Sequence, residues 1–567
     1  MNTPFNAVGW EVSRFGKVVI TAGLPYADGE IHLGGITSTY LPADILARFF
    51  RLKGDKVVFA CATDDFGTPI LIQAEKERKS PEAFVAHWYK ADKKDFDNLG
   101  ISFDIFHQTS SNENIQFTQN IFKKLHEKGF IFNQLVSQPY CEKCRKVLPD
   151  RYVKGTCPHC KATDQYSDGC EECGKVFQPG EIKDSHCALC GSKPVSNQSE
   201  HYFFKLSQFS DALKKWLIES KSLQPEVKNY VLDWISTGLE DWDITRDITW
   251  GVPIPLDEAK GKVLYNWFDN HLCYISTTLK HLSDKGIDGK AFWNSSRIYH
   301  FIGKDIVYHH YLFLPAMRLG AKEFKLPDFI PTRGHMQLQG MKFSKSRRWY
   351  VSLREFLNLF PADYLRYYLA AITPYSQSDV KFEWEDFQSR INNELIANIG
   401  NFIHRTLTFI WSNCSGDVPE ARNYEKLDVQ FKGEIETIAN NAGEEIERIE
   451  LNRGLKKILE FSSFCNQYFQ RKEPWTKTED TSTCLYLCAN AVRSFAILLE
   501  PYLPFSAEIL WQQLNLGGSI HQQNWDSASI LNVRSGHRIN KPRILFRRIE
   551  SEEIKREKEK LQRLSVD

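Results

Sequence analysis

Residues 17–65, KVVITAGLPYADGEIHLGGITSTYLPADILARFFRLKGDKVVFACATDD, decide the fold of this chain. Residues 17–24 are a short apolar run rich in β-branched side chains. Residues 36–52 have the apolar pattern of a helix that Gly54 closes, and residues 56–63 form a second β-rich run. Strand, helix and strand within fifty residues predict a βαβ unit and therefore an α/β fold with a parallel sheet.

His32 lies in the turn between the first strand and the helix of this unit. Parallel sheets bind nucleotides where strands end and helices begin, and the free N–H groups of a helix start favour phosphate. The sequence has neither a G-x-G-x-x-G motif nor a Walker A loop, so a phosphate cradle here is of another kind.

The composition is that of an ordinary globular protein, with 42% hydrophobic and 25% charged residues. At 567 residues we expect two to four domains. The 72 basic residues nearly balance the 71 acidic ones, so contacts to RNA would have to come from local patches. Neither a signal-peptide core nor eighteen uninterrupted apolar residues occur, and we expect a cytoplasmic protein without a membrane span.

Further elements follow from the apolar pattern. Strands are expected at residues 297–303 and 325–331. From about residue 380 the apolar residues recur at the helical period, which predicts an all-helical C-terminal domain with helices near 430–472 and 482–500. The charged residues 551–567 predict a final helix with a solvated face.

Eight of the 14 cysteines form four C-x-x-C pairs. The pairs are Cys141 with Cys144, Cys157 with Cys160, Cys170 with Cys173, and Cys187 with Cys190. Four thiolates saturate a tetrahedral Zn²⁺, so the spacing predicts two structural zinc sites and no disulfides. Spacing leaves open whether the pairs combine in sequence or nested, first with fourth and second with third.

The stretch MKFSKS, residues 341–346, is the second candidate phosphate-binding motif. Lys342 and Lys345 bracket Ser344 and follow Gly340, a hinge that would let the loop close over a triphosphate. A pentavalent phosphorus in a transition state needs cations and N–H donors aimed at it, and His32 with these lysines would supply them.

The stretches GLPYADGEIHLGG, YLPADILARFFRLKGD, DWDITRDITWGVPIP, HFIGKDIVYHH and GMKFSKS together resemble the methionyl-tRNA synthetases, a class I family, and in particular the archaeal type. The resemblance runs over essentially the whole chain and favours nested zinc ligation. It implies a Rossmann-type catalytic domain (1–115 and 241–330), a connective peptide (116–240) with zinc knuckles at about 141–190, a KFSKS-loop domain (331–385), an anticodon-binding helical bundle (386–545) and a charged tail (546–567).

The resemblance also implies an activity and its residues. Methionine would be activated by ATP with Mg²⁺ and passed to tRNA(Met). The catalytic residues would be His32, Lys342 and Lys345, and the ATP-binding residues would be His32, Gly34, Gly35, Gly303, Asp305 and Lys345. The residues that bind methionine would be Leu24, Tyr26, Asp64, Trp267, Tyr274, Ile306 and His310. The residues that read the anticodon would be Asn401, Arg405 and Trp475.

These assignments make physical sense. A thioether is polarizable and a weak acceptor, which aromatic walls and one polar ring can recognise. Asp64, at the end of the second strand, would accept the substrate ammonium. Asn401 and Arg405 are four residues apart on one helix face, and base-edge hydrogen bonds with stacking on Trp475 would suit a single-stranded loop.

Three motifs depart from the family pattern. The usual His-x-Gly-His ends in Gly35, the usual Asp-Glu-His-Gly has Phe66 as its third residue, and the usual Trp-x-Asp-Ala-Pro-Ile-Gly-Tyr is WFDNHLCY at residues 267–274. An imidazole that stabilises transition-state charge is worth roughly 2–4 kcal/mol. We hypothesise that the hydroxyls of Thr37 or Ser38 offset its loss.

Two other functions remain open from the sequence. The chain could be a tRNA-binding paralogue that has lost adenylation, or a class I synthetase for another amino acid. A monomer is expected because the chain ends soon after the helical domain, and a tRNA-binding partner could act in trans.

Overall fold

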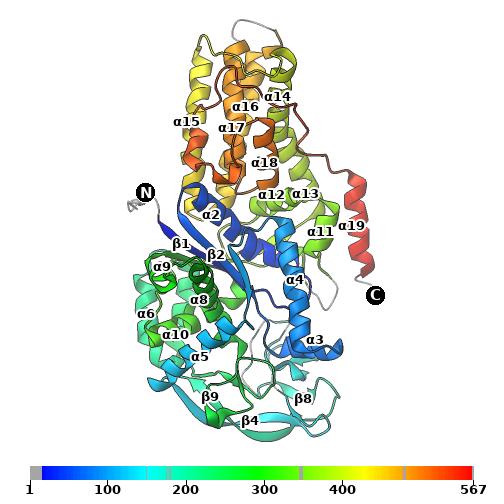
Figure 1. Cartoon of the computed structure of the whole chain (residues 1–567). Coiled ribbons are helices and arrows are strands. Elements are labelled where there is room, and N and C mark those ends of the chain that lie inside the picture. Colours follow the sequence, from blue (N-terminus) through cyan, green and yellow to red (C-terminus); the bar gives the residue numbers. More distant parts are fainter. Residues whose placement is uncertain are drawn as a thin grey trace, which may run out of the picture.

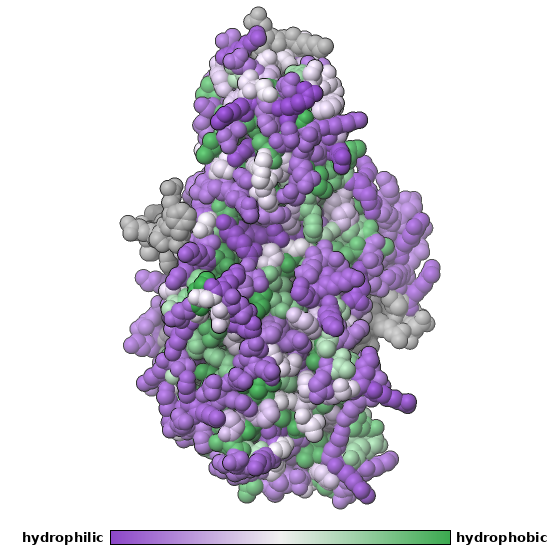
Figure 2. Space-filling view, in the orientation of Figure 1, coloured by the Kyte–Doolittle hydropathy of each residue, from purple (hydrophilic) through white to green (hydrophobic). Residues whose placement is uncertain are grey.

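The computed structural model describes residues 16–148, 150–170, 172–173, 175, 177, 180–343, 349–476 and 481–564. The molecule is elongated, with a helical bundle at one end, a β-rich module that carries the cysteines at the other, and a parallel sheet between them (Figure 1). In Figure 2, hydrophilic residues are spread over the visible face and hydrophobic ones lie in small groups among them.

The central sheet is parallel throughout, in the order β14-β13-β1-β2-β3. Its strands are β1 (Lys17–Ala22), β2 (Lys56–Thr63), β3 (Ile105–Gln108), β13 (Arg297–Gly303) and β14 (Thr332–Arg333). The strand expected at 325–331 is formed only in part: Phe329 makes an isolated parallel bridge to Tyr299, and the continuous ladder with β13 begins at Thr332. Pro327 and Pro331 lack the N–H that a ladder needs.

Helices cover both faces of this sheet. Val18 and Ile20 face the hydrophobic core that the sheet shares with α2 (Leu41–Leu52) and the bundle. Val19 faces the opposite core, beneath α8 (Asn266–Asp284). Successive strand residues point to opposite faces, so a sheet buried on both sides requires the unbroken apolar runs found in β1 and β2.

The predicted helix after β1 is confirmed, and it starts earlier than expected. It runs through α1 (Leu33–Gly35), a π-helical segment (Ile36–Tyr40) and α2. After β2 the chain passes through α3 (Thr68–Lys76) and the long helix α4 (Pro81–Leu99), and it returns through Gly100 to β3. The α/β class is therefore confirmed.

The cysteine-rich module extends from two long antiparallel strands, β4 (Ile131–Cys141) and β9 (Val195–Phe204), which pair along their whole length. Short strands lie between them in sequence: β5 (Lys146–Val147), β6 (Val153–Thr156), β7 (Gln165–Tyr166) and β8 (Lys183–Cys187). The chain then returns through α6 (Ser210–Glu219) and α7 (Pro225–Thr237) (Figure 1). Helix α5 (Asn112–Glu127) contacts both β4 and α8, and α10 (Leu314–Ala321) contacts both α6 and α8, so these two helices join the module to the helix layer beneath the sheet.

The C-terminal part of the chain is helical, as predicted. Its main helices are α13 (Trp384–Arg390), a π-helical segment (Ile391–Gly400), α14 (Asn401–Asn413), α15 (Lys426–Glu447), α16 (Leu451–Lys472), α17 (Thr481–Leu499) and α18 (Pro504–Gln513). Helix α17 is long and apolar enough to cross a membrane, but 89% of its apolar window is buried inside the protein. It is the central helix of the bundle (Figure 1).

The last helix, α19 (Ser551–Leu564), is more than the solvated helix that its charges predict. Ile554 and Leu561 are buried, and the helix contacts α13. Lys560 reaches Glu355 at 3.1 Å. Two apolar residues seven positions apart lie on one helix face, which was enough to dock a helix that is otherwise charged.

Candidate functional site

His32 ends the turn after β1 and caps α1 in an extended conformation. Its ring lies over Gly34, where an added Cβ would come within 3.0 Å of the imidazole Nδ1. The ring of Phe343 lies 5.5 Å from that of His32. Because Phe343 belongs to the MKFSKS stretch, the structure brings the two signature motifs together across about three hundred residues of sequence.

The lysines of MKFSKS are only partly described. The backbone of Lys342 pairs with Gln337 in a short antiparallel ladder between β16 (Met341–Lys342) and β15 (Met336–Leu338). Lys345 lies outside the described residues.

The hypothesis that Thr37 or Ser38 replaces the missing imidazole disagrees with the geometry. Thr37 Oγ1 donates to the Leu33 carbonyl at 2.9 Å, and Ser38 Oγ donates to the Gly34 carbonyl at 3.3 Å. Both protons are thus committed to the turn before them. At Gly35 itself an added Cβ would meet only Tyr40, at an ordinary 3.4 Å.

At the position of the second missing histidine, Phe66 is a core residue. The Phe66 side chain is buried and packs at a T-shaped angle on Trp250, with ring centroids 5.1 Å apart. The following Gly67 begins α3 with φ +103°, a conformation that favours glycine.

Gly303 is the last residue of β13, the parallel neighbour of β1, and Asp305 follows shortly after it, so both lie at the same sheet edge as His32. A Cβ on Gly303 would collide with the Asp305 carboxylate and approach Ser38 to 3.9 Å. Asp305 also accepts a hydrogen bond from His335 across 3.3 Å.

Asp64 is buried at the end of β2, where its backbone bridges to Tyr26. Its Oδ2 accepts hydrogen bonds from Asn270 at 2.7 Å and Asn266 at 3.3 Å. Its Oδ1 has no hydrogen-bond partner among the described residues. Burial raises the pKa of Asp64 to about 7, against the two amide hydrogen bonds, which lower it. One oxygen therefore remains for a cationic ligand group.

Two buried carboxyl groups that the sequence did not single out lie near Asp64. Burial raises the pKa of Asp65 to about 6, and its carboxylate accepts from Ser110 at 2.5 Å. Asp269 is fully buried, and neither of its carboxyl oxygens has a partner within the described part of the chain. Burial, and then the charge of Asp64, raise the pKa of Asp269 well above its usual range.

The aromatic wall assigned to methionine is assembled from α8 and from the π-helical segment His309–Phe313. The hydroxyl of Tyr274 donates to His310 Nε2 at 2.9 Å, while His310 Nδ1 donates to the Ile306 carbonyl at 2.9 Å. Trp267 stacks on His309 with centroids 3.8 Å apart and planes at 3°. Burial lowers the pKa of His310 to about 4, so this ring is neutral.

The remaining predicted residues join the same region. Leu24 packs against the cores on both faces of the sheet. Tyr26 accepts a hydrogen bond from Asn266, 3.1 Å away, and so contacts the residue that also holds Asp64. His271 was missed, although the altered WFDNHLCY motif was its signal: its ring lies 5.4 Å from Trp267 and 4.9 Å from His310.

A cleft of about 240 Å³ opens above this wall, lined by Tyr26, Asn266 and Trp267. Arg246 lies on its rim, with its guanidinium 3.9 Å from the ring centre of Tyr265. The cysteine module contributes Arg151 and Asp168, which form an ion pair at 3.3 Å. The module therefore lines the mouth of the cleft.

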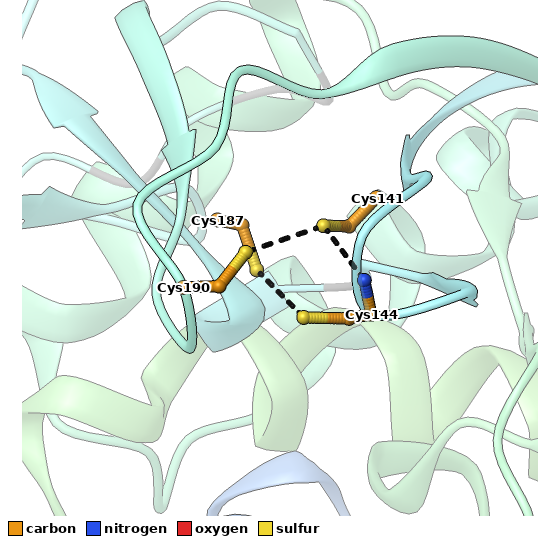
Figure 3. Close-up of side chains that lie close together, drawn as sticks. All are labelled: Cys141, Cys144, Cys187 and Cys190. Atoms are coloured by element: carbon orange, nitrogen blue, oxygen red, sulfur yellow. Dashed lines mark hydrogen bonds between the residues drawn. The ribbon is translucent and has the colours of Figure 1, made fainter.

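The eight paired cysteines form two clusters, each with four Sγ atoms within 4.8 Å of one another. One holds Cys141, Cys144, Cys187 and Cys190, and the other Cys157, Cys160, Cys170 and Cys173, which is the nested arrangement. In Figure 3 the first cluster faces inward from two separate turns.

The distances suit a metal. Closest Sγ pairs between turns are 3.5–3.9 Å apart, and a tetrahedral Zn²⁺ with Zn–S bonds of about 2.3 Å places its sulfurs about 3.8 Å apart. All 14 cysteines are free of disulfides.

A second groove, of about 520 Å³, lies on the bundle between the start of α14 and the end of α16. Asn401 and Arg405 line it together with Asn466, Gln467 and Gln470. The Arg405 guanidinium lies 5.8 Å from the ring centre of Trp475, whose side chain is 39% exposed. The three predicted anticodon residues are thus neighbours, and the α16 amides are an addition that the sequence did not single out.

Two family models match the chain. Residues 18–407 match the model described as tRNA synthetases class I (M), and residues 428–563 match the anticodon-binding domain of tRNA ligase.

Curated relatives match over nearly the whole chain. A methionine–tRNA ligase of Methanopyrus kandleri is 41% identical over 552 residues, which are 96% of this chain and 81% of that protein. A methionine–tRNA ligase of Methanobrevibacter smithii is 42% identical, over 96% of this chain and 82% of that protein.

Among solved structures, the methionyl-tRNA synthetase of Mycobacterium tuberculosis bound by methionyl-adenylate superposes with a TM-score of 0.78 at 23% identity. The match covers 94% of this chain and 100% of that chain, and it supports the fold.

Proposed function

Because this chain belongs to the methionine–tRNA ligase family of class I tRNA synthetases, we propose that it activates methionine with ATP and transfers the methionyl group to tRNA(Met). The methionine carboxylate attacks the α-phosphorus of ATP, and pyrophosphate leaves as methionyl-adenylate forms. A 3′-terminal ribose hydroxyl of the tRNA then attacks the adenylate carbonyl, and AMP leaves.

The observation that carries this proposal is the environment of Asp64. A buried carboxylate with one oxygen unpartnered in the described structure suits an α-ammonium group, and the wall of Trp267, Tyr274 and His310 is close by. Ile306, Leu24 and Tyr26 complete the set that we assign to methionine. His32 lies at the same sheet edge, where an attacking carboxylate would meet ATP.

For ATP, which would enter with Mg²⁺, we assign His32, Lys342 and Lys345 to the phosphates. Gly34 and Gly35 leave the start of α1 open to phosphate oxygens, since neither carries a side chain. Gly303 and Asp305 are assigned to the ribose.

For tRNA(Met) we assign Asn401, Arg405 and Trp475 to the anticodon, because they combine base-edge donors with a half-exposed ring for stacking. The catalytic, connective, KFSKS-loop and anticodon-binding regions have the boundaries stated above. We infer a cytoplasmic monomer, to which a tRNA-binding protein could add affinity in trans.

The two cysteine clusters are assigned two Zn²⁺ ions. Four thiolate ligands leave no open position, so the metal would brace the module and take no part in the chemistry. It would hold Arg151 and Asp168 at the mouth of the cleft.

The test is amino-acid-dependent ATP–pyrophosphate exchange with all twenty amino acids, followed by aminoacylation of tRNA(Met). We expect exchange with methionine alone, and Asp64→Asn should abolish it while an exposed matched change, Asp284→Asn, leaves it intact. Arg405→Ala should raise the KM for tRNA and leave exchange unchanged.

Two alternative functions are each supported by one observation, and each predicts a different result of the exchange assay. Asn270 and His271 replace the usual Ala and Pro in the pocket wall, and exchange with another amino acid would favour a changed specificity. Gly35 and Phe66 replace two histidines, and no exchange with any amino acid would favour a tRNA-binding paralogue.

A further inference from the structure

His271 is a fully buried histidine whose two ring nitrogens have no hydrogen-bond partner among the described residues. A neutral imidazole carries one N–H donor and one acceptor nitrogen. A buried donor or acceptor without a hydrogen-bond partner is destabilising. Two such ring nitrogens in the wall of a binding site therefore indicate that the bound ligand supplies a partner.

The ring lies within the wall assigned to the methionine side chain. Its centroid is 5.4 Å from that of Trp267, 5.6 Å from that of His309, and 4.9 Å from that of His310 at a T-shaped angle. Three rings of the wall therefore border His271.

The polar groups of Tyr274 and His310, two wall residues next to His271, are already used. His310 Nδ1 donates to the Ile306 carbonyl, and His310 Nε2 accepts from the hydroxyl of Tyr274. Asn270, the residue before His271, donates a hydrogen bond from its side-chain amide to Asp64. His309 Nδ1 also has no partner among the described residues, but the face of that ring stacks on Trp267. His271 is the described wall histidine with both ring nitrogens buried and unpaired, and it retains a donor for a substrate side chain.

The ring is also neutral. Burial, and then the neighbouring His310, His309 and Arg318, lower the pKa of His271 well below its usual range. A neutral ring offers one donor without a charge, which suits a weak acceptor better than it suits a carboxylate.

We propose that His271 is a specificity-determining residue that donates its ring N–H to the sulfur of bound methionine, which rests on the proposed function. Consecutive residues then serve the two ends of one substrate: Asn270 holds the carboxylate that pairs with the ammonium, and His271 contacts the thioether. An isosteric side chain with CH₂ in place of sulfur accepts no hydrogen bond, so it would leave the donor unpaired.

The experiment compares methionine with norleucine, its CH₂ isostere, in ATP–pyrophosphate exchange. We expect His271→Phe, which keeps a ring and removes both nitrogens, to lower the ratio of kcat/KM values for methionine over norleucine by about three- to tenfold. His271→Gln retains an N–H donor and should keep the ratio within about twofold.

The thermal stability of the variants distinguishes a role of His271 in substrate specificity from a role in folding. Because His271→Phe removes two unpaired polar atoms, its Tm should equal or exceed that of the wild type while its discrimination falls. Cys273→Ala is the matched control: this residue is equally buried on the same helix, and the change should leave the ratio unaltered. If His271→Phe does not fold, His271→Leu supplies the same comparison.

An unchanged ratio in the variant without nitrogens would overturn the inference and leave the proposed function standing. An equal loss in His271→Gln would also overturn it, because shape would then decide the ratio. A wild-type protein without methionine-dependent exchange would overturn the proposed function, and the inference with it.

Discussion

At the scale of the residue, the proposed ammonium site depends on the ionisation of one carboxyl group. Asp64 can pair with a substrate ammonium only when it carries its charge, and its pKa of about 7 lies well above the usual 3.8. The group is therefore protonated at acid pH and charged above neutrality. The amide of Asn270 lowers this pKa by hydrogen bonding to the charged form.

We predict that the KM for methionine falls as the pH rises through about 7. In Asn270→Ala the transition should move to higher pH, and the KM at pH 7 should rise about three- to tenfold for the loss of one hydrogen bond. Exchange kinetics between pH 5.5 and 8.5 measure both effects. Asn440→Ala, an exposed amide of α15, is the control. A KM that does not vary with pH would contradict the assignment of Asp64.

A second residue-scale prediction concerns the hydroxyls that follow Gly35. Thr37 and Ser38 donate to carbonyls of the preceding turn and have no proton left for a phosphate. Thr37→Ala and Ser38→Ala should therefore change the rate of adenylation by less than about twofold, since a lost transition-state donor costs about 10²–10³. Single-turnover adenylation measures this, and a loss above tenfold in either variant would restore the compensation hypothesis.

At the scale of the element, π-helical segments border each part of the assigned sites. Residues Ile36–Tyr40 follow the His32 turn, His309–Phe313 contains His310, and Ile391–Gly400 precedes Asn401. A π-turn inserts residues into an α-helix and re-aims the side chains beside it, and such turns are frequent at functional sites. These segments let continuous helices present His310 and Asn401 at angles that regular α-helices would not give.

The cysteine module yields the element-scale prediction. We expect two zinc ions per chain by elemental analysis, and one in Cys187→Ser. Because Cys187 and Cys144 share a cluster, Cys144→Ser should have the same effect, and the double variant should lose no more than either alone. Cys157→Ser combined with Cys187→Ser should lose both ions. Cys414→Ser, outside the clusters, is the control. Loss of both ions from Cys144→Ser with Cys187→Ser would contradict the nested assignment.

At the scale of the whole molecule, a buried ionic network joins three regions of the chain. Arg366 of α12 (Ala362–Ile372) contacts Asp44 of α2 at 2.7 Å and the Pro501 carbonyl after α17 at 2.8 Å. Arg48 bridges the same Asp44 to Glu500 at 2.9 and 2.6 Å. Because α2 continues the helix that His32 caps, the network ties the sheet edge at His32 to the bundle.

We predict that Arg366→Met destabilises the protein by about 3–5 kcal/mol, since it removes one partner of a fully buried charge. Urea denaturation measures the change. Lys456→Met, which removes a highly exposed partner of Glu460, should change stability by less than about 0.5 kcal/mol. A loss below 1 kcal/mol in Arg366→Met would show that the network does not hold the regions together.

The same network gives a pH dependence of known sign. Burial would raise the pKa of Asp44, but Arg48 and Arg366 hold it at about 2, below the usual 3.8. The stabilisation is therefore complete above about pH 4 and is lost as the pH falls through 2. Arg366→Met should flatten this part of the stability curve.

Much of the fold was predictable because it depends on local patterns. The apolar period separated β1, the helix after it and β2, and the same period identified the bundle helices. Where the pattern was ambiguous, the prediction held only in part: KLPDFIP at residues 325–331 is apolar like a strand, but its two prolines lack N–H donors, and only Phe329 forms an isolated bridge to Tyr299. The docking of α19 was missed because only Ile554 and Leu561 lie on its buried face.

The sequence alone determined the α/β class, the four cysteine pairs, the two signature motifs and the resemblance that joins them, since each is a matter of residue type and spacing. Only the tertiary structure decided which cysteine pairs combine, that the Thr37 and Ser38 protons are already used, and that Asp64 and His271 have polar atoms without a partner among the described residues. These properties depend on burial and on contacts between segments far apart in the chain, and hydrogen-bond partners become known only when those segments meet.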